Sequence, residues 1–366
     1  METKDMQKEF PLVSIIMLNR NGITTLSYDL HKCIRAVLKS SYPNLELIFV
    51  DNGSSDGSVD FVRSIFGQDS RVRVVENHGN PTVGEAKRNA VSYARGTYLV
   101  FLDNDTIVEE NWLNELVGVM CSDLSIGIGQ SLLLMKSSSL QIQHAGGLMN
   151  SWGLSFGRDF GKKSACIPSN ITEVFYAAGA AMVTRKDLLI KVGLVDPKLR
   201  FIDDVDLSWR VRLYGKRVVL VPSSRVQHRG SSTTSSIEFR LLRDRCFAKE
   251  LVYILLKNYS WRSLVSTMPS VSLLVALTVM HRISHRRFRE SATMVFGVFD
   301  LFKCLRNVWQ SRSQVQRYVR KVSDANLKPH IMQVRLADLF MNAMDYLFSG
   351  RAKFPEGRLT RMDERP

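Results

Sequence analysis

The chain is 366 residues long, and at ~100–200 residues per domain it should hold two domains, or one large domain with an appendage. Hydrophobic residues make up 45% and charged residues 23%, which excludes disorder and fibrous repeats as the main organisation. Five cysteines form no CxxC pair, which argues for a reducing compartment and against a disulfide framework or a structural zinc site. The first ten residues, METKDMQKEF, contain no apolar run typical of a secretory signal, so we expect this part of the chain not to cross a membrane.

The positive charge is concentrated in the C-terminal third. The whole chain holds 50 Lys and Arg against 35 Asp and Glu, a net charge of +15. Residues 237–366 hold 23 basic and 11 acidic residues, or +12, which leaves +3 for residues 1–236. A nearly neutral first region suits an enzyme, whereas the basic region needs a partner such as an anionic membrane or a nucleic acid.

Strands and helices are predicted to alternate over the first hundred residues. The predicted strands are the apolar runs 12–18, 45–50 and 98–102, together with 72–75. The predicted helices lie between them, at roughly 26–40, 59–66 and 83–95. This alternation predicts an α/β fold with a doubly wound parallel sheet.

The pattern loosens after about residue 107. Short strands are predicted at 173–176 and 217–221, and helices at 186–192 and about 204–214. Gly- and Ser-rich pieces between them are typical of loops, so this half is interpreted as a mixed sheet that closes over the first half. We expect a mobile loop at Gly230–Ser236 to end the catalytic region.

The basic C-terminal region is predicted to be helical. A helix at 237–258 is followed by an uncharged run from Ser263 to Met280, which Pro269 interrupts and an Arg-rich cluster ends. This run is at the low edge of the ~20 residues that a bilayer span needs, and a second apolar piece, 293–302, is shorter. We therefore expect a peripheral or shallowly inserted membrane region rather than a true span.

Three polar clusters follow predicted strands, at Asn19–Gly22, Asp51–Gly57 and Asp103–Thr106. Ligands of such sheets bind beyond the carboxyl ends of the strands. Helix capping is the commoner use of Asp and Ser and would explain one such cluster. Three clusters at the same edge favour a binding site.

Asp103-Asn104-Asp105 directly follows a predicted buried strand. Alternating side chains leave a strand in the same direction, so both carboxylates can face one divalent cation, or one ribose and diphosphate. A lone DxD is common by chance, and its position after the strand is what strengthens the interpretation. The alternative is a capped turn that opens a helix from Glu109.

A second acidic group, Asp203-Asp204-Val205-Asp206, begins a predicted helix. Stabilisation by the helix dipole is one explanation. Adjacent like charges at Asp203 and Asp204 also raise at least one pKa, which suits a general base. We assign a function to Asp204 and a structural role to Asp206, which is four residues from Arg210 and positioned to pair with it.

Histidines at two positions are candidates for the site. A lone histidine is more often a satisfied polar residue than a ligand. His228, at the end of the strand-like RVQH segment, is nevertheless a plausible nitrogen ligand, because the DxD lacks a third protein ligand. His144 is weaker and is expected to shape an acceptor pocket or to have no role.

Several segments resemble the family 2 inverting glycosyltransferases of GT-A fold, in particular the rhamnosyltransferase-like and galactofuranosyltransferase-like branch. Its first two motifs are similar to VSIIMLNRNG and ELIFVDNGSSDGS, and the segment leading into its DxD is similar to NHGNPTVGEAKRNAVSYARGTYLVFLDNDT. Its acceptor-side block resembles FYAAGAAMVTRKDLLIKVGLVDPKLRFIDDVDLSWRVRLYGKRVVLVPSSRVQHRGSS. The resemblance covers about 11–235, with the motifs in the family's order.

The resemblance implies a nucleotide-diphospho-sugar transferase (GT-A, Rossmann-like) catalytic domain over residues 1–236. Its nucleotide-binding half would be about 11–106 and its acceptor half about 107–236. Residues 237–366 would then form a basic, amphipathic, membrane-associating helical region.

The resemblance also implies roles for individual residues. The donor nucleotide would contact Asn19, Asn21, Asp51, Asn52, Asp103 and Asn104, with Asp51 bonding the base. Mg²⁺ or Mn²⁺ would bind Asp105 and His228, with Asp103 beside them. The acceptor or sugar pocket would include Gly179, Ala180 and Trp209. Asp204 would be the base; the family usually has Glu-Asp where this chain has Asp203-Asp204, which leaves open which of the two is the base.

The function predicted from the sequence is a metal-dependent inverting hexosyl or deoxyhexosyl transferase of class EC 2.4. The donor would be a nucleotide-diphosphate sugar, and the acceptor a hydroxyl of a lipid-linked glycan, a polysaccharide or a glycoprotein glycan. We expect it at the cytoplasmic face of an anionic membrane, in polysaccharide or cell-envelope biosynthesis. A non-catalytic sugar-nucleotide-binding scaffold is the alternative. Nucleic-acid binding is not expected, because the basic region has no zinc motif or aromatic-basic RNA signature.

Overall fold

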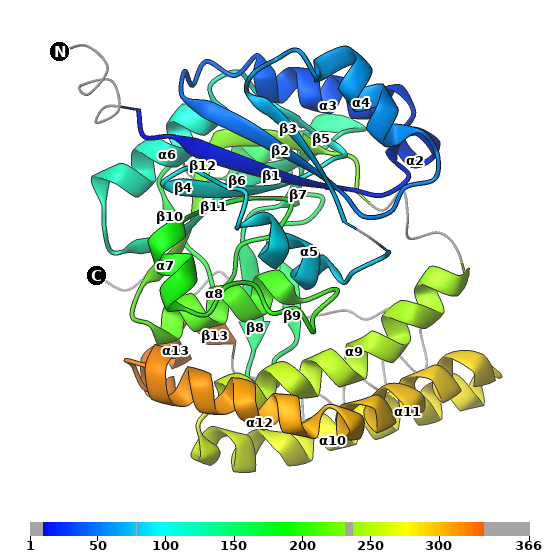
Figure 1. The fold of residues 1–366 in the computed structure, drawn as a ribbon. Coiled ribbons are helices and arrows are strands. Elements are labelled where there is room, and N and C mark those ends of the chain that lie inside the picture. Colours follow the sequence, from blue (N-terminus) through cyan, green and yellow to red (C-terminus); the bar gives the residue numbers. More distant parts are fainter. Residues whose placement is uncertain (1–9, 78, 168, 231–236, 333–366) are drawn as a thin grey trace.

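The structure is a computed structural model that describes residues 10–332 apart from 78, 168 and 231–236. Its centre is a mixed sheet in the order β10-β12-β6-β11-β4-β1-β2-β3, with β5 paired to β12 and β7 to β6 (Figure 1). A small second sheet has the order β13-β8-β9. The strands of the large sheet are β1 (Val13–Asn19), β2 (Leu45–Asp51), β3 (Val72–Glu76), β4 (Tyr98–Asp103), β5 (Thr106–Val108), β6 (Ile126–Met135), β7 (Ser138–His144), β10 (Thr172–Glu173), β11 (Ala181–Arg185) and β12 (Arg217–His228). The small sheet contains β8 (Gly147–Asn150), β9 (Ser155–Gly157) and β13 (Ile331–Met332).

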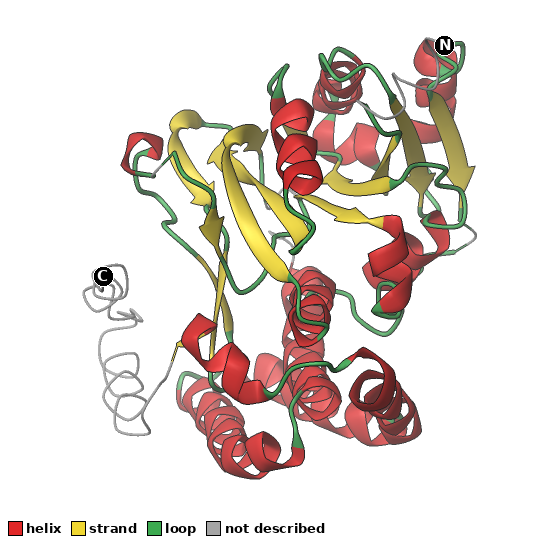
Figure 2. Cartoon of the chain, turned by 90° about the vertical axis from the view of Figure 1, so that its left-hand side faces the viewer, coloured by secondary structure: helices red, strands yellow, loops and turns green. Residues whose placement is uncertain are grey.

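Helices cover both faces of the large sheet, and a separate helical layer lies to one side (Figure 2). The helices on the catalytic half are α2 (Gly22–Leu26), α3 (Tyr28–Leu38), α4 (Ser58–Phe66), α5 (Val83–Ala90), α6 (Trp112–Ser122), α7 (Lys186–Lys191) and α8 (Asp203–Leu213). The C-terminal helices are α9 (Ile237–Asn258), α10 (Trp261–Ser284), α11 (Phe288–Lys303), α12 (Leu305–Gln314) and α13 (Asp324–Leu327).

The two apolar faces of β1 explain why its sequence is a continuous hydrophobic run. Ile15 and Met17 pack into one core with residues of α3, α4 and α6, while Ile16 packs into the other with residues of α5 and α8. A strand buried on both faces is typical of a parallel sheet, and β1 is parallel to both β2 and β4. The predicted α/β fold is therefore confirmed, although the helix predicted at 83–95 ends at Ala90, where the chain passes into turns.

The register of the parallel strands aligns their polar ends. Asn19 pairs with Asp51 across β1 and β2, and Leu18 pairs with Asp103 across β1 and β4. The three predicted polar clusters consequently lie along one edge of the sheet.

Strand β12 is longer than the predicted 217–221. A register shift between Val221 and Arg225 lets the strand continue, paired with β6 on one side and β5 on the other. Both sides of the backbone therefore find hydrogen-bond partners as far as His228, which pairs with Thr106. The extension places His228 beside the DxD segment.

The first helix of the C-terminal region is anchored to the catalytic half by a buried ionic network. Asp206 in α8 is fully buried and accepts hydrogen bonds from Arg210 Nε at 2.9 Å and Lys257 Nζ at 2.8 Å. Asn258 Nδ2 donates a third at 2.9 Å, and Lys257 also pairs with Asp196 at 2.5 Å. Asp206 thus pairs with Arg210 as predicted and joins α8 to α9.

Replacing Asp206 with alanine is expected to lower the free energy of unfolding by about 3–5 kcal/mol, because Arg210 and Lys257 would keep buried charges without this acceptor. Thermal or urea unfolding followed by circular dichroism measures the change. The control is Asp187→Ala: Asp187 and Lys191 form a pair with the same spacing but side chains 62% and 55% exposed, so the loss should stay below about 0.5 kcal/mol. Equal losses for the two variants would contradict the argument.

Helix α10 runs without a break through Pro269, where the sequence predicted an interruption. Pro269 lies on the exposed side of the helix, where water can satisfy the carbonyl that loses its amide partner. Among the helices that the structure describes, α10 alone is both long enough and apolar enough to cross a membrane. The Arg-rich helical segments predicted beyond residue 332 lie outside the described residues.

Candidate active site

Hydrogen bonds join the loops that follow β1, β2 and β4. Asn19 Nδ2 donates to Asp51 Oδ1 at 2.9 Å, and Asn104 Nδ2 donates to Asn19 Oδ1 at 2.8 Å. Asn19 is therefore the link between the three polar clusters. These bonds fix the loops relative to one another.

The loop after β2 is folded around the side chain of Asp51. This carboxylate is 2% exposed, and it accepts hydrogen bonds from the backbone N–H of Ser54 at 2.8 Å and from its hydroxyl at 2.5 Å. Asn21 adopts a left-handed conformation with φ of 50°, which asparagine tolerates, and accepts a hydrogen bond from Ser55 N. Asn52 accepts one from Asn77 Nδ2 at 2.9 Å. These predicted donor-binding residues shape the loop, and a contact to a base remains a prediction.

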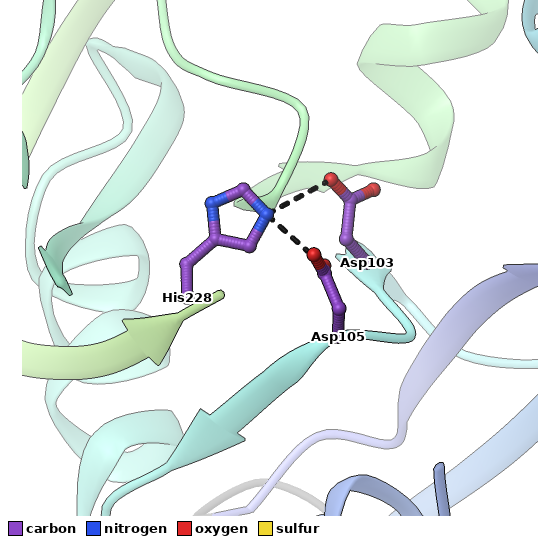
Figure 3. Close-up of side chains that lie close together, drawn as sticks. All are labelled: Asp103, Asp105 and His228. Carbon is purple, nitrogen blue, oxygen red and sulfur yellow. Dashed lines mark ion pairs between the residues drawn. The ribbon is translucent and has the colours of Figure 1, made fainter. Parts of the chain in front are cut away.

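Asp103, Asp105 and His228 form a cluster of potential metal ligands (Figure 3). His228 Nε2 lies 3.0 Å from Asp105 Oδ1 and 3.7 Å from Asp103 Oδ2, and the three ligand atoms lie within 4.8 Å of one another. Two carboxylate oxygens and one imidazole nitrogen suit Mg²⁺ or Mn²⁺. The side chain of Asp103 is 49% exposed, so one side of the cluster is open to a ligand.

Gln143 is a functional candidate that the sequence did not single out. Its Oε1 lies 2.6 Å from His228 Nδ1 and can only accept there. A proton on Nδ1 therefore points at Gln143, and Nε2 faces the carboxylates. Such an outer partner orients a metal-binding histidine and fixes its tautomer. Gln143 belongs to β7 and His228 to β12, and both strands pair with β6. The contact between the two side chains therefore becomes visible only in the folded sheet.

Lys87 in α5 is the second residue missed at the sequence level. Its Nζ lies 2.9 Å from Asp203 Oδ2, and both side chains are buried. Burial lowers the pKa of Lys87, but the negative charges of Asp203, Asp103 and Asp204 outweigh this effect and raise it overall. A charged lysine thus lies among the carboxylates of both predicted acidic motifs. The local sequence GEAKRN showed only a helix, so nothing in it pointed to this role.

The adjacent carboxylates Asp203 and Asp204 have different environments. Asp203 is 4% exposed and paired with Lys87, whereas Asp204 is only partly buried and accepts a hydrogen bond from Gly179 N at 2.9 Å. Burial and the charge of Asp203 raise the pKa of Asp204 to about 6. Asp204 therefore has the properties of a base that operates near neutral pH.

If Asp204 is the base, kcat/KM is expected to rise about tenfold per pH unit below pH 6 and to level off above it, because only the ionised carboxylate accepts a proton. Initial rates between pH 4.5 and 8 at saturating metal test this. A profile without an inflection between about pH 5 and 7 would exclude Asp204 as the titrating group.

The residues predicted for the acceptor or sugar pocket lie in two different places. Gly179 and Ala180 precede β11 at the site: Gly179 contacts Asp204, and Ala180 O accepts a hydrogen bond from Asp103 N. Trp209 is fully buried and packs edge-on against Phe175 and Tyr259. Its prediction as a pocket residue is corrected to a core residue, because it occurs on the inner side of α8.

His144 is held within the acceptor half. Its Nδ1 lies 3.1 Å from Gln130 Nε2 and its Nε2 lies 3.3 Å from Tyr176 Oη. Burial lowers the pKa of His144 to about 4, so the ring is neutral near pH 7. His144 is therefore a hydrogen-bonded structural residue here.

A cavity of about 540 Å³ opens beside the cluster, and its lining includes Gln143, whose Oε1 contacts His228. Two cations line it, Lys136 and Arg229, and both pair with Asp29 at 2.5 and 3.5 Å. Two positive charges facing one carboxylate leave an excess of positive charge, which suits an anionic part of a ligand.

Parts of the chain are similar to known glycosyltransferases. Residues 14–193 match the model of glycosyl transferase family 2. Glycosyltransferase GlyG of Streptococcus pneumoniae is 38% identical over 85 residues, which are 23% of this chain and 28% of that protein. The Escherichia coli protein WfgD, a UDP-Glc:alpha-D-GlcNAc-diphosphoundecaprenol beta-1,3-glucosyltransferase, is 36% identical over 109 residues, 30% of this chain and 41% of that protein. The chain therefore matches less than half of the length of these relatives.

Solved structures share the fold. The crystal structure of GalNAc-T7 with UDP, GalNAc and Mn²⁺ superposes with a TM-score of 0.52 at 19% identity, over 68% of this chain and 48% of that one. The mannosyltransferase PcManGT from Pyrobaculum calidifontis, in complex with GDP-Man and Mn²⁺, superposes with a TM-score of 0.50 at 15% identity, over 80% and 87%. The family and the relatives named above are glycosyltransferases, the enzyme class predicted from the sequence. Residues 14–193, just under half of the chain, thus match glycosyl transferase family 2, and they are carried on a GT-A-like mixed sheet.

Proposed function

We propose that the chain is a metal-dependent inverting glycosyltransferase that moves a hexosyl or deoxyhexosyl group from a nucleotide-diphosphate sugar to an acceptor hydroxyl. The observation that carries the proposal is the grouping of a three-ligand cluster and a partly exposed carboxylate of raised pKa around the buried cation Lys87. These are the two parts that such a transfer needs: a site for the leaving diphosphate and a base for the acceptor. Solved structures of the same fold hold UDP or GDP-Man with Mn²⁺, which supports the donor class.

Each residue then has a role in the transfer. Asp103, Asp105 and His228 would hold Mg²⁺ or Mn²⁺, which neutralises negative charge on the leaving nucleoside diphosphate. Asp204 takes the proton of the acceptor hydroxyl, whose oxygen attacks the anomeric carbon from the side opposite the leaving group and inverts its configuration. The Gly179 N–H orients the Asp204 carboxylate. Lys87 neutralises Asp203, so that a single carboxylate remains to act as the base.

The proposed acceptor is a lipid-linked or polymeric glycan at the cytoplasmic face of an anionic membrane. The relative WfgD is named for a diphosphoundecaprenol-linked substrate, and the Bacillus subtilis relative TuaG, 35% identical over 95 residues, for teichuronic acid biosynthesis. The basic C-terminal region supports a membrane-borne acceptor. The rhamnosyl or galactofuranosyl branch stays a prediction.

The first test is a thermal shift of the full chain against UDP-, GDP-, dTDP- and CDP-sugars, each with and without Mn²⁺. A ligand at 100 times its Kd stabilises by about 2.7 kcal/mol, which is readily measured. We expect one nucleotide class to stabilise, and only with metal. Stabilisation that is independent of metal would contradict the proposed role of the cluster. Donor binding without any turnover on lipid-linked acceptors would favour the non-catalytic scaffold instead.

A further inference from the structure

We propose that the outer sides of α10 and α11 form a docking face for an anionic lipid surface, on which both helices lie in the plane of the headgroups. The docking face is defined by Val265, Leu273 and Met280 of α10 and by Phe296, Phe299 and Phe302 of α11. This proposal of a docking face depends on the proposed function in one respect, namely that the acceptor is expected at a membrane. Figure 1 shows α10 and α11 on the side of the helical layer that is farthest from the large sheet.

Helix α11 has two apolar sides, and one of them packs against the rest of the protein. Met294 and Leu301 are buried, and Gly297 approaches the backbone of Arg245 in α9 so closely that a side chain would not fit. On the other side, Phe296, Phe299 and Phe302 are 56, 58 and 61% exposed. Their spacing of three residues places them on one stripe of the helix. Three large exposed aromatic residues in one stripe indicate a contact surface.

Helix α10 has the same organisation. Its inner side buries Leu264, Thr267 and Val271, whereas Val265 and Met280 are 75 and 56% exposed. Only 17% of its most apolar window is buried, which distinguishes it from the core helix of a soluble protein. Because α10 packs against α11, the two exposed sides belong to one layer of helices.

The charge around the docking face complements an anionic surface. Residues 261–320 hold ten Lys and Arg but only two Asp and Glu, Glu290 and Asp300, and both of these are paired with arginine. Arg289 and Lys303 lie seven residues before and after Phe296, so they flank the aromatic stripe. Arg289 and Arg306 form no ion pair with the part of the chain that the structure describes. Aromatic residues flanked by basic residues are typical of helices that lie in the membrane interface.

The ends of α10 favour an in-plane position over a span. Near its start, Ser263 Oγ donates to Asp324 Oδ2 at 2.7 Å, and near its end Arg282 Nη2 donates to Asp244 Oδ1 of α9 at 2.9 Å. Helix α9 is anchored to the catalytic half through Asp206. Both ends of α10 are thus held against the same protein layer, so the helix lies along that layer.

Lipid is a better occupant of the docking face than protein from this chain. A second copy would bring two strongly basic surfaces together, and their repulsion opposes pairing. Residues 333–366 hold six basic and five acidic residues, so they offer no net negative charge to complement the face.

The test is co-sedimentation of the purified full chain with phosphatidylcholine vesicles containing 0 or 30% phosphatidylglycerol. We expect binding to the anionic vesicles and release by 1 M NaCl or alkaline carbonate. The triple variant Phe296→Ser, Phe299→Ser, Phe302→Ser should bind at least about tenfold more weakly. Arg289→Gln with Arg306→Gln should weaken binding about fivefold per residue.

The control for the Phe variant is Leu124→Ser with Leu140→Ser, two apolar side chains of the catalytic half that are 68 and 70% exposed. The control for the Arg variant is Lys39→Gln with Lys163→Gln. These variants should bind as the unchanged chain does. Equal binding by the Phe variant, or binding that resists carbonate, would overturn the proposal. So would a dimer, seen by analytical ultracentrifugation without lipid, that the Phe variant abolishes. The Mn²⁺-dependent shift with nucleotide sugars should be the same in every variant, which separates failure of docking from failure of the proposed catalysis.

Discussion

Asp204→Asn is expected to reduce kcat by about 10²–10⁴-fold and, at pH 7, to raise the free energy of unfolding by about 1–2 kcal/mol. The amide cannot accept the acceptor's proton, which explains the loss of rate. The gain in stability follows from the raised pKa: the folded state holds this proton more tightly than the unfolded chain, whose Asp pKa is about 3.9. The protonated Asp204 therefore stabilises the folded state fully below about pH 3.9, and this stabilisation is lost as the pH rises through about 6. The neutral side chain avoids this loss.

Asp203→Asn is the matched comparison, one residue away in the same helix. It removes the charge that pairs with Lys87, so we expect the free energy of unfolding to fall by about 1–3 kcal/mol. Turnover and thermal unfolding of both variants, at pH 7 and at pH 4.5, distinguish the two roles. At the lower pH, the stability gain of Asp204→Asn should shrink. If Asp203→Asn proved the more stable and the less active of the two, the assignment of the base would be reversed.

Asp105→Asn and His228→Ala are each expected to weaken Mn²⁺ binding at least about 100-fold and to lower kcat/KM by a similar factor at limiting metal, with partial recovery in excess Mn²⁺. Each removes one of the three ligand atoms of the cluster. Titration calorimetry, or electron paramagnetic resonance of free Mn²⁺, measures the affinity. Chelation by EDTA should abolish turnover of the unchanged enzyme, and added Mn²⁺ should restore it.

Two neighbouring residues test whether the geometry of the cluster matters. Gln143→Leu removes the acceptor for His228 Nδ1, so Mn²⁺ affinity should fall about 10–100-fold although no ligand is lost. Asn104→Ala is the control, because this side chain donates to Asn19. Its Mn²⁺ affinity should change less than about threefold. A large loss for Asn104→Ala together with none for Gln143→Leu would contradict the arrangement of ligands described above.

Local sequence patterns predicted the elements that depend on local physics. The buried strands β1, β2 and β4 were found because apolar residues cover both of their faces, and the paired Asp103 and Asp105 were found because they follow such a strand directly. The prediction failed where pairing between distant segments decides the structure. The sequence offered 217–221 and the strand-like RVQH segment as separate pieces, whereas pairing with β5 and β6 makes them one strand, β12.

The α/β class, the edge at which the polar loops gather, the acidic motifs and the basic C-terminal region were all predicted from the amino-acid sequence. Each of these follows from periodicity, composition or the spacing of neighbouring residues. The hydrogen-bond partners of the site residues became known from the folded structure: Lys87 donates to Asp203, Gln143 contacts His228, and Lys257 donates to Asp206. It also moved Trp209 into the core. Burial and proximity set the pKa and the exposure of a side chain, and both depend on segments that are up to 116 residues apart in the chain.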